Sequence, residues 1–213
     1  MKESLLVWGS SLILILSVTT SHATPPVATT LSYEDTTYTR VITERSGKIV
    51  ATLGLPDSAS FYRVRTIVTG QYRALNAVYT QRDQQLKQLK ESQPAPDKNT
   101  VDSLKATIQQ NVDGKIAQLH QAYLSKLATE LNQQQIDKVK DGMTYNVVEV
   151  TFHAYEQMLP TLTDEQKARI MADLIEAREH AMDAESSEKK HAWFGKYKGR
   201  INNYLSSQGI HMK

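Results

Sequence analysis

The stretch WFGKYKGRINNYL, residues 193–205, holds the side chains of this chain that are best suited to binding a ligand. Amines, guanidinium groups and amides hydrogen-bond to hydroxyls or carboxylates, and a tryptophan ring stacks on the face of a sugar. We therefore predict a site for a carbohydrate or an anionic small ligand in this stretch. Its predicted residues are Trp193, Lys196, Lys198, Arg200 and Asn203.

The same stretch has a second interpretation, which is the packing of a helix against a core. On a helix, Phe194, Tyr197 and Ile201 share one apolar face. Gly195 and Gly199 share another face, and each costs about 1 kcal/mol relative to alanine inside a helix. The close approach of a second backbone or a ligand would offset that cost. We expect the glycines and aromatic residues to pack, and the basic and amide groups with the tryptophan to bind.

The second long helix, which we predict between an N-cap at Asp57 or Ser58 and a loop over residues 91–100, adds three residues to the predicted site. Tyr72 belongs to its apolar seam, and Arg82 and Asp83 form an adjacent pair of opposite charges. Such a pair could orient a ligand, or it could form a salt bridge within the helix or between helices. We include Tyr72, Arg82 and Asp83 among the ligand-binding residues.

No residue pattern in the chain indicates catalysis or metal binding. Glu176, Glu179 and His180 share one helical face and could ligate a metal, but zinc proteases need two histidines in such a motif. We favour a solvated face beside the basic segment. Serine-hydrolase, Walker and dinucleotide motifs are absent from the sequence. We therefore predict no metal, cofactor or catalytic residue, and favour a binding protein over an enzyme.

The chain begins with MKESLLVWGSSLILILSVTTSHATPP, which has the features of a secretory signal peptide. Residues 1–23 contain a lysine, an apolar stretch and small residues before Ala23. An uncleaved membrane anchor is the alternative, but the stretch is shorter than the ~20 residues that span a bilayer. We predict a periplasmic or secreted protein with no membrane segment after cleavage, and a loose arm over residues 24–35.

Composition narrows the class of partner. The formal net charge is +2, from 25 basic and 23 acidic residues, and cysteine is absent. Binding to nucleic acid or to a membrane surface usually requires a clearly basic face, so we expect neither. Without disulfides, an exported fold depends on packing alone. Composition leaves the oligomeric state open.

Apolar residues recur at three- and four-residue spacing along most of the chain, which predicts an all-α fold. We expect a single helical domain over residues 36–213, a bundle of about six helices. Its base is a long antiparallel hairpin of the second long helix and a third helix over residues 101–131, joined by a proline-containing loop over residues 91–100. The β-branched segment 144–151 breaks the period, and we predict an extended connector there.

Two short motifs share the pattern Leu-(Asn/Thr)-x-x-Gln. In a capping box, Asn132 or Thr163 accepts from the first turn while Gln135 or Gln166 reaches back to the cap. We therefore interpret both motifs as the starts of helices.

Four stretches together resemble a bacterial family called domain of unknown function 3826. They are KIVATLGLPD, QYRALNAVYTQRD, VKDGMTYNVVEVTFHAYEQMLPTLTDEQ and EAREHAMDAESSEKKHAWFGKYKGRINNYLSSQG. The resemblance covers about Tyr38 to Gly209, and it implies an exported helical protein, often encoded near polysaccharide-degradation genes and loosely described as sugar-binding. The family has no established activity, so it implies no catalytic residue.

The two capping motifs are also similar to those of Spy-type periplasmic chaperones. Three hypotheses follow from the sequence. The first is a non-catalytic binding module for a saccharide or another envelope ligand, linked to polysaccharide use. The second is a Spy-like chaperone or stress protein, and the third is an uncharacterised enzyme.

Overall fold

Helices form the regular structure of the residues described by the computed structural model, which are residues 33–94 and 97–210. Strands are absent from these residues, so the predicted all-α class is confirmed. The helices are α1 (Tyr33–Ala51), α2 (Ser58–Glu91), α3 (Lys98–Ala128), α4 (Gln133–Met143), α5 (Val147–Met158), α6 (Asp164–Met182) and α7 (Ser187–Ser207). The described part of the chain thus has seven helices, where we expected about six.

Polar side chains accept hydrogen bonds at the starts of most of these helices. Asp57 accepts from the backbone N–H of Ser60 (2.7 Å) at the start of α2. Asp97 caps α3 and Ser186 caps α7 in the same way. Each cap satisfies a backbone donor that the helix itself leaves unpaired.

Both predicted capping boxes are confirmed. At the start of α4, Gln135 N donates to Asn132 Oδ1 (2.9 Å) and Asn132 N donates to Gln135 Oε1 (3.1 Å). At the start of α6, Thr163 and Gln166 make the same reciprocal pair. Gln135 Nε2 also donates to the carbonyl of Leu53 (3.1 Å), which ties α4 to the end of α1.

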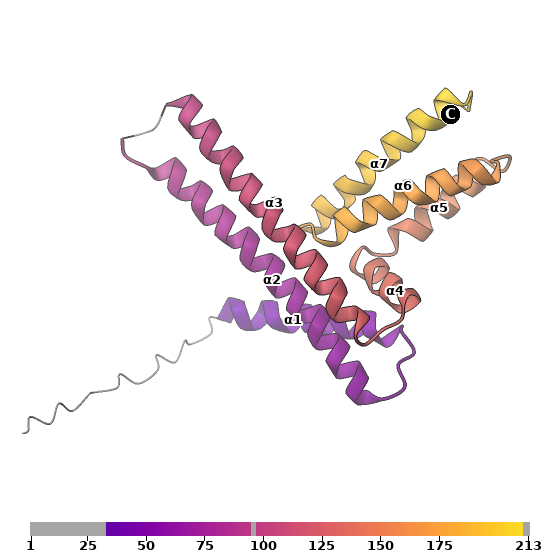
Figure 1. The fold of residues 1–213 in the computed structure, drawn as a ribbon, viewed down its shortest axis with the longest axis horizontal. Coiled ribbons are helices and arrows are strands. Elements are labelled where there is room, and N and C mark those ends of the chain that lie inside the picture. Colours follow the sequence, from indigo (N-terminus) through magenta and orange to yellow (C-terminus); the bar gives the residue numbers. More distant parts are fainter. Residues whose placement is uncertain (1–32, 95–96, 211–213) are drawn as a thin grey trace, which may run out of the picture. The chain divides into compact units, whose positions relative to one another are not determined.

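The helices pack mainly against their neighbours in the chain. α2 and α3 run side by side in opposite directions, and α1 packs against α2 (Figure 1). α6 packs against both of its neighbours in the chain, α5 and α7. α4 contacts α1, α3 and α6, so it links the α2–α3 pair to the α6–α7 pair.

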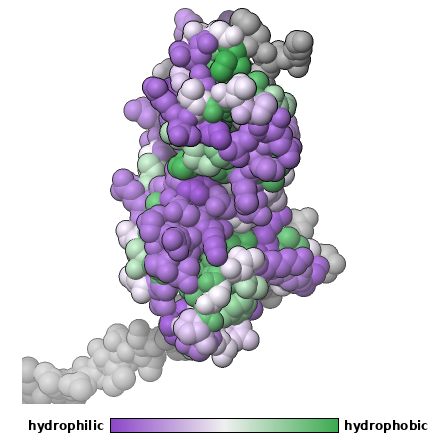
Figure 2. Space-filling model, turned by 90° about the vertical axis from the view of Figure 1, so that its right-hand side faces the viewer, coloured by the Kyte–Doolittle hydropathy of each residue, from purple (hydrophilic) through white to green (hydrophobic). Residues whose placement is uncertain are grey.

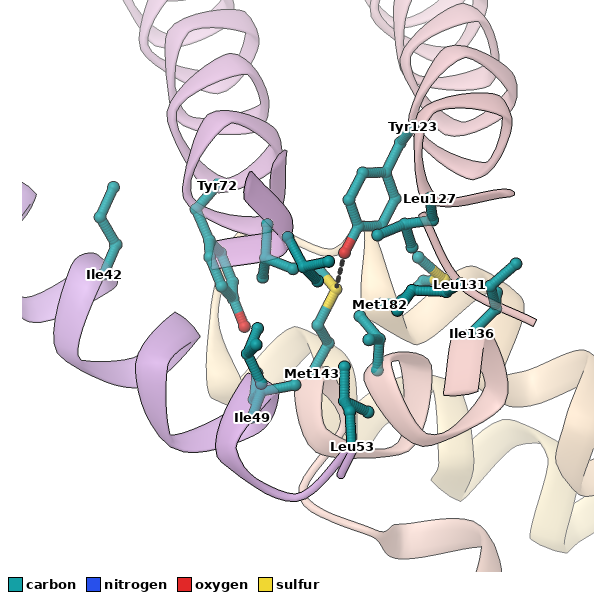
Figure 3. Close-up of a cluster of buried hydrophobic side chains, with 14 residues drawn as sticks. Ile42, Ile49, Leu53, Tyr72, Tyr123, Leu127, Leu131, Ile136, Met143 and Met182 are labelled. Carbon is teal, nitrogen blue, oxygen red and sulfur yellow. Dashed lines mark hydrogen bonds between the residues drawn. The ribbon is translucent and has the colours of Figure 1, made fainter. Parts of the chain in front are cut away.

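Two clusters of buried apolar side chains hold these helices together. The first combines residues of α1 to α4 with Met182, the last residue of α6 (Figure 3). In it, the Tyr123 hydroxyl donates to the sulfur of Met143 (3.2 Å). The second cluster joins α5, α6 and α7, with Phe194 and Ile201 almost fully buried. Because α6 contributes to both clusters, its C-terminal end has a fixed position against α2 and α3.

The segment 144–151 is helical from Val147 onward, so the predicted extended connector is wrong. Val148 is buried in the second core cluster. β-Branched residues are only slightly less favourable in helices than average, and burial of an apolar face outweighs that difference. The turn is confined to the residues just before α5, where Tyr145 and Asn146 have positive φ angles of 60° and 56°.

Hydrophilic side chains cover most of the face shown in Figure 2, and apolar ones form separate small areas. Within the described ranges, no helix has the length and apolar character needed to cross a membrane. The predicted signal peptide, residues 1–23, lies outside the described residues, and so does the predicted arm up to residue 32. Both stay predictions, as does the export that depends on them.

Candidate functional site

A groove of about 710 Å³ lies where side chains of α2, α3, α6 and α7 meet. Aromatic rings, amides, carboxylates and basic groups line it together, a mixture that suits a small polar ligand. The polar and aromatic lining residues are Tyr79, Arg82, Gln109, Asp113, His120, Gln121, Glu179, His180, Asp183, Glu185, Lys189 and Trp193.

Asp183, which follows the last residue of α6, is the most densely bonded residue of the groove. Its Oδ2 lies 2.6 Å from His120 Nδ1, and its Oδ1 accepts from Gln71 Nε2 (3.2 Å). Its backbone carbonyl accepts from the Tyr79 hydroxyl (2.8 Å). These bonds attach the end of α6 to both α2 and α3, so the groove has a fixed shape.

Burial determines the protonation state of Tyr79. Burial, followed by the nearby carboxylates of Glu185 and Asp183, raises the pKa of Tyr79 to about 12. The hydroxyl therefore stays protonated near neutral pH and keeps its hydrogen bond to the Asp183 carbonyl, while its oxygen can still accept a hydrogen bond in the groove.

His120 stands between two carboxylates. Its Nε2 is 3.6 Å from Glu179 Oε2, while its Nδ1 bonds to Asp183. The hydrogen bond with Asp183 raises the pKa of His120, and the charge of Glu179 adds to this effect. A histidine bonded to one carboxylate can serve as a general base. Here the second carboxylate favours the imidazolium form, which lacks the lone pair that a base needs.

Two cations, Lys140 and Arg178, also bind the carboxylate of Glu179. Lys140 Nζ of α4 donates to Glu179 Oε2 (2.8 Å), and Arg178 NH2 lies 3.4 Å from Glu179 Oε1. Arg178 is 5% exposed and donates to Asp137 (2.7 Å) and Asp141 (2.8 Å) of α4. This network fixes the register of α6 against α4, and thereby the position of Glu179 in the groove.

Lys190 supports the loop between α6 and α7 from its buried side. Its Nζ donates to the backbone carbonyls of Ala181 (3.0 Å) and Met182 (2.8 Å) at the end of α6. Burial lowers its pKa to about 8. Cations are favourable at helix C-termini, where carbonyls are left unpaired.

Trp193 lies in the groove and contacts His180 of α6 and Lys196 of its own helix. The His180 ring stacks on the indole, with centroids 4.4 Å apart and an interplanar angle of 15°. Lys196 Nζ is 4.9 Å from the centroid of the indole. Because a lysine side chain is flexible, a sugar that stacks on Trp193 can displace Lys196 more readily than His180.

Arg82 also lines the groove, and it forms an ion pair with Asp83, the adjacent residue of the predicted site. Arg82 NH2 donates to Asp83 Oδ1 (2.7 Å), and it bonds to Glu185 in the α6–α7 loop. The predicted salt-bridge alternative for this pair is therefore present. Arg82 remains positioned to contact a ligand, whereas Asp83 is absent from the groove lining.

The basic part of the predicted site lies elsewhere on α7. Lys196, Lys198, Arg200 and Asn203 are exposed and do not line the groove. Arg200 pairs with Asp173 (3.0 Å) and with Glu176 (3.0 Å) of α6. The structure thus separates these four residues from Arg82, and their role in ligand binding stays a prediction.

Tyr72 is not part of the groove either, because it is buried in the first core cluster with 7% of its surface exposed.

The glycines of α7 also differ from expectation. A Cβ atom at Gly195 or Gly199 would have no other atom within 4 Å, and both residues are exposed. The expected close packing of these glycines is therefore wrong, although the aromatic side chains beside them do pack.

The three groups weighed as metal ligands have separate partners. Glu176 accepts from the Tyr197 hydroxyl (2.8 Å), which lowers the pKa of Glu176, Glu179 pairs with Lys140, and His180 stacks on Trp193. The described ranges contain no group of three His, Cys, Asp or Glu side chains that could hold a metal ion.

Sequence reasoning missed the pairing of His120 with Asp183. The two residues are 63 positions apart, and neither belongs to a short motif. His120 is partly exposed, and in sequence it looks like an ordinary boundary residue of a helix. The only local signal is the end of the α6 pattern at Asp183, which gives no information about α3.

Comparison with known proteins places the chain in a family. A family model described as "Protein of unknown function (DUF3826)" matches residues 39–213. This match supports the resemblance seen in the sequence, and it does not extend to Spy-type chaperones. No curated protein matches the chain.

Proposed function

Because the chain belongs to DUF3826, a family without a described activity, its role has to be inferred from its groove, and we propose that this groove binds a neutral saccharide. The observation that carries the proposal is the combination of Tyr79 and Trp193 with amide and carboxylate groups in one groove. Aromatic rings pack on the apolar faces of sugars, and amides and carboxylates bond to their hydroxyls.

The charges of the groove favour a neutral ligand over an anion. Arg82 is paired with Asp83 and Glu185, and His120 is paired with Asp183. An anionic ligand would have to compete with these carboxylates for the same cations. A ligand that needs only hydrogen bonds can use the remaining capacity of the carboxylate oxygens and amides.

The groove is also prearranged. Asp183 is bonded to α2 and α3, and the buried Arg178 attaches α6 to α4. Binding to such a groove loses little conformational freedom in the protein, so weak individual sugar contacts can add up to measurable affinity. We infer that the protein serves polysaccharide use outside the cytoplasm, in line with the predicted signal peptide.

Tryptophan fluorescence tests this proposal directly. The chain has two tryptophans, and Trp8 lies in the predicted signal peptide, so the chain without residues 1–23 leaves Trp193 as the single reporter. We expect a saturable change in emission on titration with at least one member of a panel of neutral oligosaccharides. A ligand at ~100 times its dissociation constant should also raise the melting temperature by roughly 5–10 °C.

Gln121→Ala provides the test of the site, because Gln121 is exposed and lines the groove. We expect it to weaken saccharide binding by about threefold to tenfold, the effect of one hydrogen bond. Gln134→Ala on α4 is the matched control and should leave affinity unchanged, since Gln134 is exposed and outside the groove lining. A panel without any emission or melting change would refute the proposal.

The chaperone hypothesis receives less support. Its sequence basis is the pair of Leu-(Asn/Thr)-x-x-Gln motifs, and both are accounted for by the capping boxes of α4 and α6. A motif whose polar groups are already bonded within its own helix start is not available to recognise unfolded chains.

A further inference from the structure

Arg45, on the exposed side of α1, is a cation without a carboxylate partner. Its guanidinium carbon lies 5.9 Å from the ring centroid of Tyr72 and 6.0 Å from that of Tyr145. It forms no ion pair with any residue in the described ranges, and its neighbour Glu44 bonds to Arg40 instead (3.1 Å). Beyond its contact with the Tyr72 hydroxyl, Arg45 therefore keeps N–H donors that can bind an anion.

Tyr72 brings a buried hydroxyl without an acceptor to the same place. The residue is 7% exposed, and within the described part of the chain its hydroxyl approaches only the donor groups of Arg45, so its own proton has no acceptor. Figure 3 shows Tyr72 extending from α2 on the side of the core where Ile49 of α1 lies. A buried donor that lacks an acceptor destabilises the fold. An anion held by Arg45 would supply that acceptor.

The protonation state of Tyr72 fits this role. Burial raises the pKa of Tyr72 to about 12, and the positive charge of Arg45, together with its hydrogen bond to the hydroxyl, reduces this increase in part. The hydroxyl is therefore a donor at all physiological pH values, and it lies within electrostatic reach of Arg45 and Tyr145.

Tyr145, just before α5, combines a strained backbone with a partly exposed ring. Tyr145 and Asn146 both adopt the left-handed conformation, with φ angles of 60° and 56°. This conformation is uncommon outside glycine, and asparagine tolerates it better than tyrosine does. The Tyr145 ring is 40% exposed and stacks on His191, with centroids 5.8 Å apart. Strain of this kind is frequent at ligand sites, where a side chain needs a particular position.

We propose that Arg45, Tyr72, Tyr145 and His191 form a second site, which binds the carboxylate of a hexuronic acid. The guanidinium group of Arg45 pairs with the carboxylate, and the Tyr72 hydroxyl donates to it. The open ring of Tyr145 packs on the apolar face of the sugar, and His191 adds a polar ring beside it. An exposed aromatic ring next to an unpaired arginine suits a sugar acid better than a bare oxyanion, which has no apolar face.

This site goes beyond the proposed function. None of its four residues lines the groove, and its ligand carries a negative charge that the groove disfavours. The two sites can therefore succeed or fail independently. A protein with both would hold a mixed polysaccharide at a neutral unit and at an acidic unit.

Isothermal titration calorimetry of the full chain tests the second site with D-galacturonate, D-galactose as its neutral match, and inorganic phosphate. We expect galacturonate to bind about tenfold or more tightly than galactose, because a charge-assisted pair is lost with the neutral sugar. Galactose binding as tightly as galacturonate, with both weakened equally by Arg45→Gln, would overturn the proposal, whereas galactose binding that is weakened by Gln121→Ala belongs to the groove. Phosphate binding as tightly as galacturonate would overturn the assignment of a sugar acid.

Variants locate the binding. Arg45→Gln should weaken galacturonate binding by about tenfold or more, whereas Arg40→Gln, on the same helix, should leave it unchanged. Tyr72→Phe should weaken it by about threefold to tenfold with little change in melting temperature, because the hydroxyl has no acceptor to lose in the free protein. Unchanged affinity in Arg45→Gln would overturn the proposal. Gln121→Ala, a groove variant, should bind galacturonate as the parent chain does.

Discussion

His120 Nδ1 of α3 lies 2.6 Å from Asp183 Oδ2, directly after the end of α6. Asp183 is 5% exposed and stands at a helix C-terminus, where the helix dipole disfavours a negative charge. A carboxylate in that position requires a cation, and His120 provides it. The contact therefore links the protonation of one histidine to the packing of the α2–α3 pair against the α6–α7 pair.

The stability of the fold should depend on pH through His120. Its folded pKa is raised by Asp183 above the unfolded value of about 6.5. The stabilisation is therefore fully present below about pH 6.5 and is lost as the pH rises through the folded pKa. We expect the free energy of unfolding to fall over that interval, by at most about 1.4 kcal/mol per pH unit. Urea unfolding from pH 5.5 to 8.5 measures it.

Two variants isolate the contribution of His120 to this slope. His120→Gln removes the titrating group and should flatten the profile relative to the parent chain. His153→Gln should keep the parent slope, because His153 is 68% exposed and 3.9 Å from its nearest carboxylate, Glu156. A parent slope that persists in His120→Gln would show that another group is responsible.

Replacement of Arg178 by methionine should destabilise the fold strongly. Arg178 is 5% exposed and bonds to Asp137 and Asp141, and its removal leaves several carboxylates close together. The loss of one partner of a buried pair costs about 3–5 kcal/mol. Because Asp137 and Asp141 are partly exposed and can be solvated, we expect about 2–3 kcal/mol, or roughly 5–10 °C in melting temperature.

Arg40→Met is the matched control for this substitution. Arg40 pairs with Glu44 on the surface of α1, with both side chains more than half exposed. Such pairs contribute about 0–0.5 kcal/mol, so the melting temperature should barely change. Equal effects of the two substitutions would contradict the role assigned to the network between α4 and α6.

The two capping boxes should be structural and nothing more. Asn132→Ala and Thr163→Ala should each cost about 1 kcal/mol in urea unfolding, and the double variant about 2 kcal/mol, since the helix starts are independent. Asn76→Ala, at an exposed position inside α2, should cost less than about 0.5 kcal/mol. If a capping variant instead lost aggregation suppression at unchanged stability, the motif would belong to a chaperone surface.

Local patterns in the sequence predicted the fold better than they predicted the site. The caps at Asn132 and Thr163, and the long seams of α2 and α3, depend on residues within one or two turns of each other. Such relations are readable along the chain. The predicted extended connector over 144–151 was wrong because a run of β-branched residues is typical of a strand. Burial of Val148 in the second core cluster favours a helix there instead.

The groove could not be predicted in this way. Trp193 and Arg82 were recognised by residue type, but the contact between His120 and Asp183 joins positions 63 residues apart. The lack of a carboxylate partner for Arg45 could not be predicted from the sequence either, because it depends on which acidic residues the other helices place near it. Residue type identifies groups that can bind a ligand, and only the packing of helices decides which of them remain available.

The open glycines of α7 give the sharpest test of how this helix surface is used. A Cβ at Gly195 or Gly199 meets no atom within 4 Å, so alanine at either position should stabilise α7 by about 0.5–1 kcal/mol in urea unfolding. Gly142→Ala is the contrasting variant. Its Cβ would lie 2.9 Å from Cγ1 of the buried Ile49, and the resulting overpacking should cost about 1–3 kcal/mol. If Gly195→Ala or Gly199→Ala were destabilising instead, this face of α7 would be covered by a partner in solution, and its neighbouring Lys198 would regain its place as a binding residue.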